Sequence, residues 1–161
     1  MPVMLLTVSL IIAAIILIAL LSWALTIFVH RYLKDGLRPL ARWLVGLLVV
    51  QFILGMASNL FVTIPKVKPY LVFHEFGPIA IHAANGVLII ILAVWLRILA
   101  GRQKRYIAPA AIGGVSAAIA FAAGVIFVNF GQNNIYSFIM AVGFITAFTE
   151  YAYIAFRTSK K

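Results

Sequence analysis

The stretch IAIHAANGVLIIILAVWLRIL, residues 79–99, decides the class of fold, because it is long, apolar and free of charge before Arg97. Crossing a hydrocarbon core of about 30 Å takes about 20 mainly apolar residues in a helix. Stretches of the same kind lie at residues 3–28, 43–64, 107–130 and 135–156. The sequence therefore predicts an all-α integral membrane protein, a five-transmembrane-helix bundle forming a single membrane domain over residues 1–161.

The composition agrees with this class. Of 161 residues, 65% are hydrophobic and 10% are charged, and the mean hydropathy is +1.14, whereas soluble domains are about half apolar. Residues 3–28 have no basic residue before them and exceed the apolar core of about 7–15 residues in a secretory signal, so we interpret them as a retained helix. Cysteine is absent, which excludes disulfides, thiolate-bound clusters and cysteine nucleophiles.

The positive charge follows the predicted topology. Lys66 and Lys68 fall on one side of the membrane, and the other eleven of the 13 basic residues fall on the opposite side. The positive-inside rule then places the N-terminus outside and the C-terminus in the cytoplasm, in a multi-pass protein of the plasma membrane. This distribution also explains the net charge of +10 without a nucleic-acid partner. The eleven residues are Arg31, Lys34, Arg38, Arg42, Arg97, Arg102, Lys104, Arg105, Arg157, Lys160 and Lys161.

The connections between the helices are expected to be short, with two exceptions. Residues 30–42 form a basic loop in which Gly36 and Pro39 are turn signals. Residues 65–77 form the longest external loop, which carries His74 and Glu75.

Two features suggest how the helices pack. The hairpins 43–99 and 107–156 have the same orientation, and GMASNLF (55–61) aligns with GVIFVNF (124–130), so an internal repeat is one interpretation. The helix predicted over 107–130 carries small residues every fourth position, and this spacing allows close helix packing, either within the bundle or against another subunit. These small residues are Ala110, Gly114, Ala118 and Ala122, together with Gly113 and Ala117.

The polar residues inside the apolar stretches are the main functional lead, because such residues are costly in hydrocarbon and usually face the bundle interior. They gather at one depth, in the outer leaflet, on the helices over 43–64, 79–99 and 135–156. We predict an outward-facing pocket or cofactor site there. Its expected residues are Gly55, Asn59, His82, Asn85, Gly86 and Met140.

His82 allows two interpretations. It is either a neutral imidazole bridging to Asn59, Asn85 or Ser58, or an axial haem ligand with small neighbours that leave room for a porphyrin. His74 lies eight residues away, about 12 Å along a helix, so the two histidines do not share one metal ion.

The second buried ionisable group is Glu150, in the stretch 135–156. It is expected to pair with Arg97 or His30; a proton path from the cytoplasm is the alternative.

The pattern formed by Gln51, Gly55, His82 and Gly86 resembles one helical hairpin of the haem A synthase family and allied small membrane haem proteins. The resemblance covers about a third of the chain. It implies that His82 binds haem iron on the outer side. In this family the second ligand comes from the matching helix of the next hairpin, where this sequence has Ile139 in place of a histidine.

Two functions follow as hypotheses. The first is a small membrane protein of respiratory type that binds haem b near the outer leaflet, with His82 as ligand to the iron, and exchanges electrons, a quinone being a further candidate cofactor. The second is a non-catalytic accessory subunit or assembly factor, with other membrane subunits or further copies of the chain as partners within the lipid bilayer. The sequence leaves open whether the protein is an enzyme.

Overall fold

The structure is a computed structural model, and it describes residues 36–61, 77–130 and 132–157. Contacts divide the chain into two units, residues 1–36 and 37–161, and all the described helices belong to the second. Its helices are α2 (Leu37–Phe61), α4 (Gly77–Arg102), α5 (Ile107–Asn129) and α6 (Asn134–Phe156). The predicted helix over 3–28 lies outside the described residues, as do His30, His74 and Glu75.

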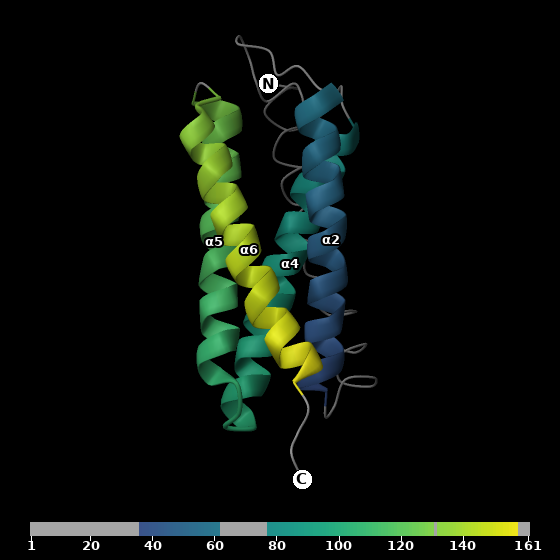
Figure 1. Ribbon diagram of the computed structural model, residues 1–161, viewed down its shortest axis with the longest axis vertical. Coiled ribbons are helices and arrows are strands. Elements are labelled where there is room, and N and C mark those ends of the chain that lie inside the picture. The colour runs from purple at the N-terminus through teal and green to yellow at the C-terminus, as the bar shows by residue number, and fades with distance from the viewer. Residues whose placement is uncertain (1–35, 62–76, 131, 158–161) are drawn as a thin grey trace, which may run out of the picture. The chain divides into compact units, whose positions relative to one another are not determined.

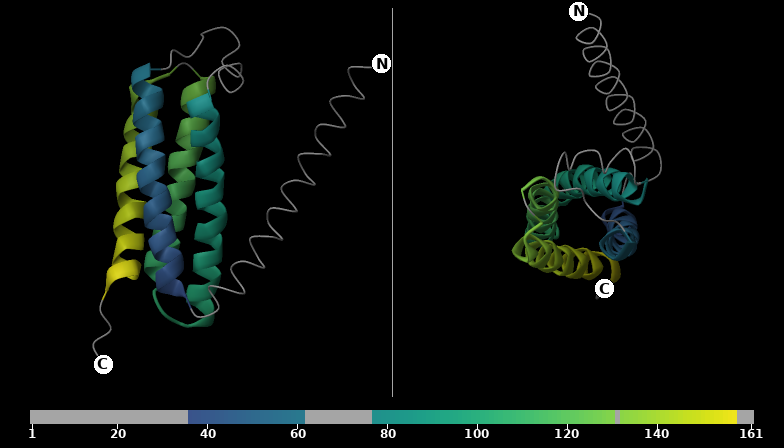
Figure 2. Two further views of the ribbon diagram at one scale, coloured as in Figure 1. Left: turned by 90° about the vertical axis from the view of Figure 1, so that its right-hand side faces the viewer. Right: turned by 90° about the horizontal axis from the view of Figure 1, so that it is seen from above.

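The four helices form a ring in which each contacts two others. The contacting pairs are α2–α4, α4–α5, α5–α6 and α6–α2, and among the described residues the diagonal pairs do not touch. Seen from above, the helices surround a common centre (Figure 2). Successive helices run in opposite directions, so α2 and α5 begin at the end where α4 and α6 finish (Figure 1).

All four helices are long and apolar enough to cross a membrane, with 23 to 26 residues each. Even 23 residues span about 34 Å at about 1.5 Å per residue. Large apolar side chains cover their outer surfaces, including Trp43, Phe52, Val94, Val115 and Ile145. A soluble helix would carry polar residues on this face. The described part of the chain therefore has the make-up of a multi-pass membrane protein.

The observed helices match the predicted stretches except at the start of α2. We expected residues 30–42 to form a loop, but α2 already begins at Leu37 and includes Pro39. Proline is tolerated in the first helical turn because the amide hydrogen it lacks would have no partner there. The turn signal at Pro39 is therefore a helix-start signal, and Arg38 and Arg42 belong to the helix.

The apolar core is concentrated at one end of the ring. On α2 the buried residues all lie between Leu37 and Leu48, and on α6 they all lie between Gly143 and Ala155. The largest fully buried side chains share this end: Leu40, Leu44, Leu96, Tyr151 and Ile154. The other half of the ring has less apolar filling from α2 and α6, and the polar side chains of the predicted site lie in that half.

Helices α5 and α6 approach closely through glycine. A Cβ atom on Gly143 would lie 2.7 Å from the carbonyl oxygen of Ser116, and one on Gly113 would lie 2.5 Å from the ring of Tyr151. Of the small residues predicted to pack, Ala110 is buried, whereas Ala118 and Ala122 are exposed. Gly113 and Ala117, the other two small residues of the predicted set, are buried, so the side of the set that carries them is the one that packs within the ring.

Every lysine and arginine in the described part of the chain lies at or near the end where the core is packed. These residues are Arg38, Arg42, Arg97, Arg102, Lys104, Arg105 and Arg157. We call this end of the ring the basic end. The described residues thus keep the one-sided charge distribution on which the topology prediction depends.

Candidate functional site: a polar cluster between α2 and α4

Gln51, His82 and Asn85 form one hydrogen-bonded cluster in the half of the ring away from the basic end. The Asn85 side-chain nitrogen donates to the carbonyl oxygen of Leu47 at 3.1 Å and to Gln51 Oε1 at 2.8 Å. The Gln51 side-chain nitrogen lies 3.3 Å from His82 Nε2. The cluster ties α2 to α4, and Leu47 supplies it with a fixed backbone acceptor.

These bonds determine where the imidazole of His82 carries its proton. A backbone carbonyl only accepts, so it sets the orientation of the Asn85 amide, and that amide in turn sets the orientation of Gln51. The Gln51 nitrogen is then the group facing His82, and an amide nitrogen only donates. His82 Nε2 must therefore accept, which leaves the proton of a neutral ring on Nδ1.

His82 Nδ1 is buried and has no hydrogen-bond partner among the described residues. A buried donor left without a partner costs about 1–3 kcal/mol. Ser58 Oγ, on α2, is likewise buried without a partner in the described part of the chain. The cluster thus offers an unused donor to any acceptor that enters this half of the ring.

Two glycines make room for the cluster. A Cβ atom on Gly55 would lie 3.0 Å from His82 Cε1, so the imidazole rests directly against the backbone of α2. A Cβ atom on Gly86 would lie 3.1 Å from the Phe121 ring and 3.3 Å from the Gln51 side-chain nitrogen. Both contacts are tighter than a side chain would comfortably allow, which explains glycine at these two positions.

The structure brings four of the six predicted site residues together and leaves two outside the cluster. His82, Asn85, Gly55 and Gly86 are in it. Asn59 is exposed one turn beyond Gly55. Met140 lies across the ring on α6, with its sulfur 3.2 Å from where a Cβ of Gly124 would be.

Gln51 was not among the predicted site residues, although it is the only described side chain that contacts the His82 ring nitrogen. The sequence held a signal for it, since Gln51 and Gly55 are four residues apart on one helical face. Phe121 had no such signal, because an aromatic residue in an apolar helix is indistinguishable from a lipid-facing one without its neighbours.

The two hairpins make matching contacts. Gly55 faces His82 in the first hairpin, and Gly124 faces Met140 in the second. Gly86 faces Gln51, and Gly143 faces Ala120. The sequence alignment of the hairpins makes the glycines of each pair equivalent and places Ala120 opposite Gln51. It places Ile139, not Met140, opposite His82. Only the contacts of Gly86 and Gly143 therefore match the predicted repeat at both partners. The second hairpin keeps the close approach but has no polar group there.

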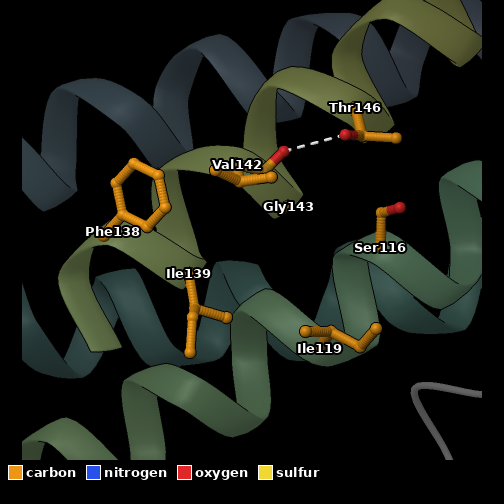
Figure 3. Close-up of a pocket in the computed structure, with 7 residues that line it drawn as sticks. All are labelled: Ser116, Ile119, Phe138, Ile139, Val142, Gly143 and Thr146. Atoms are coloured by element: carbon orange, nitrogen blue, oxygen red, sulfur yellow. Dashed lines mark hydrogen bonds between the residues drawn. The ribbon is translucent and has the colours of Figure 1, made fainter. Parts of the chain in front are cut away.

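A hollow lies between α5 and α6 and has a volume of about 200 Å³. Figure 3 shows Ser116 and Ile119 of α5 facing Phe138, Ile139 and Val142 of α6 across it. The hydroxyl of Thr146, at its edge, donates to the carbonyl oxygen of Val142 at 2.9 Å. The Thr146 hydroxyl is therefore already used within α6, and most of the residues that line the hollow are apolar. Such a hollow suits an apolar chain.

Glu150 has no ion pair with Arg97 in the described part of the chain, contrary to one of the two pairings predicted. The Arg97 guanidinium instead lies beside Gly101, 3.3 Å from where its Cβ would be. The other predicted partner, His30, lies outside the described residues. No group of three or more potential metal ligands occurs among the described residues.

The cluster offers haem b one ligand atom, His82 Nε2. A neutral imidazole is a common iron ligand. The room at Gly55 is filled by His82 itself, and that at Gly86 by Phe121 and Gln51, so a porphyrin beside the imidazole would require these side chains to move. The lone pair of His82 Nε2 accepts only the 3.3 Å hydrogen bond from Gln51, and iron would have to replace that bond. Met140 lies at a similar height, because Gly55 and Gly124 are each about 26 Å along helices that start at the basic end.

The fold and this cluster define a class: a multi-pass helical membrane protein with a buried polar contact between two of its spans. No protein-family model, curated protein or solved structure gives a significant match to the chain. The assignment of function therefore depends on the geometry of the cluster.

Proposed function

We propose that the chain is a small protein of the plasma membrane with five spans, residues 3–28 being the first, an outside N-terminus and a cytoplasmic C-terminus. The support is the position of the basic end. All described lysines and arginines lie at or near one end of the ring, and the positive-inside rule assigns such an end to the cytoplasm. The Gln51–His82–Asn85 cluster then lies in the outer leaflet.

We further propose that this cluster holds haem b, with His82 as axial ligand, in a protein of respiratory type. One observation carries the proposal: a neutral imidazole, packed against the backbone of α2 at Gly55, lies in the half of the ring that α2 and α6 leave without buried apolar side chains. The haem would supply one-electron redox chemistry. The chain itself would hold the imidazole in place against the backbone of α2 at Gly55 and keep water from it.

The arrangement also supports the resemblance to the haem A synthase family. The four residues that carry the resemblance form a chain of contacts across α2 and α4: Gly55 with His82, His82 with Gln51, and Gln51 with Gly86. His82 could also bind a quinone. Its Nδ1 is an unused buried donor among the described residues, and it would donate a hydrogen bond to a quinone carbonyl oxygen.

The absorption spectrum of the detergent-purified protein, expressed with added haem, tests the haem proposal. We expect a Soret band that His82→Ala removes and His30→Ala leaves in place. Gln51→Leu should keep the band, because it removes the group that competes for Nε2. A chain without a Soret band, or a band that survives His82→Ala, would refute the proposal.

The second candidate function is that of an accessory subunit or assembly factor in a larger membrane complex. The specific observation is that α5 exposes two small residues, Ala118 and Ala122, and small residues allow another helix to approach closely. The apolar hollow between α5 and α6 is a further place for an apolar chain. Purification from native membranes in mild detergent tests it. Co-migration with other subunits is expected, and migration as a free monomer would contradict it.

A further inference from the structure

Two arginines and two tyrosines form a continuous row at the basic end. The Arg105 guanidinium lies 5.4 Å from the centre of the Tyr106 ring. Tyr106 meets Tyr153 edge to face, with ring centres 6.1 Å apart. The Arg157 guanidinium lies 4.9 Å from the centre of the Tyr153 ring. The row therefore joins the start of α5 to the end of α6.

A third arginine joins the row from α2. The Arg38 side chain donates a hydrogen bond to the Tyr106 hydroxyl, as does that of Arg105. Slight burial raises the pKa of the Tyr106 phenol, but these hydrogen bonds and the positive charges of Arg38 and Arg105 outweigh it, so the pKa is lowered. Arg38 belongs to α2 and Arg105 to the connection between α4 and α5, so two separate segments bring guanidinium groups to Tyr106.

The positive charge of this group has no carboxylate to balance it in the described part of the chain. Asp35 and Glu75 lie outside the described residues, and Glu150 is half-buried in α6 about two turns before Arg157. No ion pair involves Arg38, Arg105 or Arg157 among the described residues. Guanidinium groups that are gathered and unpaired favour an external anion.

The position of the group restricts which anion it meets. Arg38 is in the first turn of α2, Tyr106 directly precedes α5, and Arg157 directly follows α6. The ends of membrane-spanning helices lie at the level of the lipid headgroups, where tyrosine is also enriched. The backbone of Tyr106 has φ of 56°, a left-handed conformation that favours glycine.

We propose that Arg38, Arg105 and Arg157, with Tyr106 and Tyr153, bind the phosphate of an anionic phospholipid headgroup. The three guanidinium groups supply forked donors and positive charge, and the Tyr106 hydroxyl, which accepts from two arginines, directs its own hydrogen toward the phosphate. The two rings hold the arginine side chains in place through cation–π contacts. This site is independent of the Gln51–His82–Asn85 cluster and of any haem.

Native mass spectrometry of the full chain in mild detergent, titrated with phosphatidylglycerol or phosphatidylcholine, tests this assignment. The wild type should retain phosphatidylglycerol in preference to phosphatidylcholine. The triple variant R38Q/R105Q/R157Q should need about 10–100 times more phosphatidylglycerol for the same occupancy, since it loses three charged hydrogen-bond donors to the phosphate. The matched control R42Q/R102Q/K104Q, with the same change in net charge, should stay within about threefold of the wild type.

Tyr106→Phe keeps every charge and should lower phosphatidylglycerol occupancy by a few fold, which general surface charge would not do. If the triple variant loses its helical circular dichroism signal and so fails to fold, Tyr106→Phe by itself tests the lipid site. Equal losses in the two triple variants, or an unchanged Tyr106→Phe, would overturn the proposal. Displacement of the lipid by an equal concentration of inorganic phosphate would assign the site to free phosphate and overturn the lipid assignment.

Discussion

His82 takes its chemical state from its neighbours. The chain of bonds from the Leu47 carbonyl through Asn85 and Gln51 leaves the imidazole neutral with its proton on Nδ1. A histidine in a membrane span is costly when charged, and this arrangement needs no charge. The residue is therefore equipped to bind an uncharged acceptor or, after Gln51 moves, a metal ion.

Asn85 is the residue on which the cluster depends. Asn85→Ala removes both of its hydrogen bonds to α2, and interhelical hydrogen bonds in membranes contribute about 0.6 kcal/mol on average and up to about 1.7. We expect the free energy of unfolding, measured by titration of mild detergent with denaturing detergent, to fall by about 1–2 kcal/mol. Asn59→Ala, at an exposed position on α2, should change it by less than about 0.5 kcal/mol.

Tyr151 presents the opposite case, because its buried hydroxyl contributes no bond. The ring is fully buried against Gly113, and its hydroxyl has no hydrogen-bond partner among the described residues. Tyr151→Phe should therefore leave the free energy of unfolding unchanged or raise it by about 1–2 kcal/mol. A clear loss of stability in the same detergent titration would show that the hydroxyl has a partner.

At the scale of the helix, close approach depends on single glycines. The Gly143 contact involves the backbone of α5, at the Ser116 carbonyl, and backbone does not yield as a flexible side chain does. Gly46, in α2, has nothing within 4 Å of where its Cβ would be. The two positions form a matched pair within helices of similar length.

Gly143→Ala should force α5 and α6 apart and lower the free energy of unfolding by about 1–3 kcal/mol, the usual cost of overpacking. Gly46→Ala should leave it unchanged or raise it slightly, since alanine is the better helix former by about 1 kcal/mol. Thermal unfolding of both variants in one detergent measures the difference. Equal effects of the two substitutions would contradict the close contact at Gly143.

For the four-helix ring as a whole, the uneven core predicts uneven stability. Buried apolar side chains from α2 and α6 occupy the basic end, and the polar cluster occupies the other half. Local opening starts where few apolar contacts are buried. We expect the amides of residues 40–48 to exchange hydrogen at least about tenfold more slowly than those of residues 52–60, by mass spectrometry in detergent. Uniform exchange along α2 would show that the core extends through both halves.

The sequence by itself determined the properties that each segment carries alone. Length and hydropathy gave the four described helices, with ends within a few residues of those observed apart from the start of α2. The spacing of Gln51 and Gly55 and of His82, Asn85 and Gly86 placed polar and small residues on shared faces. These are local properties, because a helix that crosses a membrane satisfies its own backbone hydrogen bonds and needs only an apolar surface.

Only the tertiary structure decided which faces meet. It made Gln51 the partner of His82, left Asn59 and Met140 outside the cluster, and turned α5 so that Gly113 and Ala117 pack inside the ring while Ala118 and Ala122 are exposed. The physical reason lies in the helices themselves. They are apolar all round, and lipid and protein interior are equally apolar, so hydrophobicity does not set the rotation of each helix about its axis; side-chain shape and a few hydrogen bonds across the ring do.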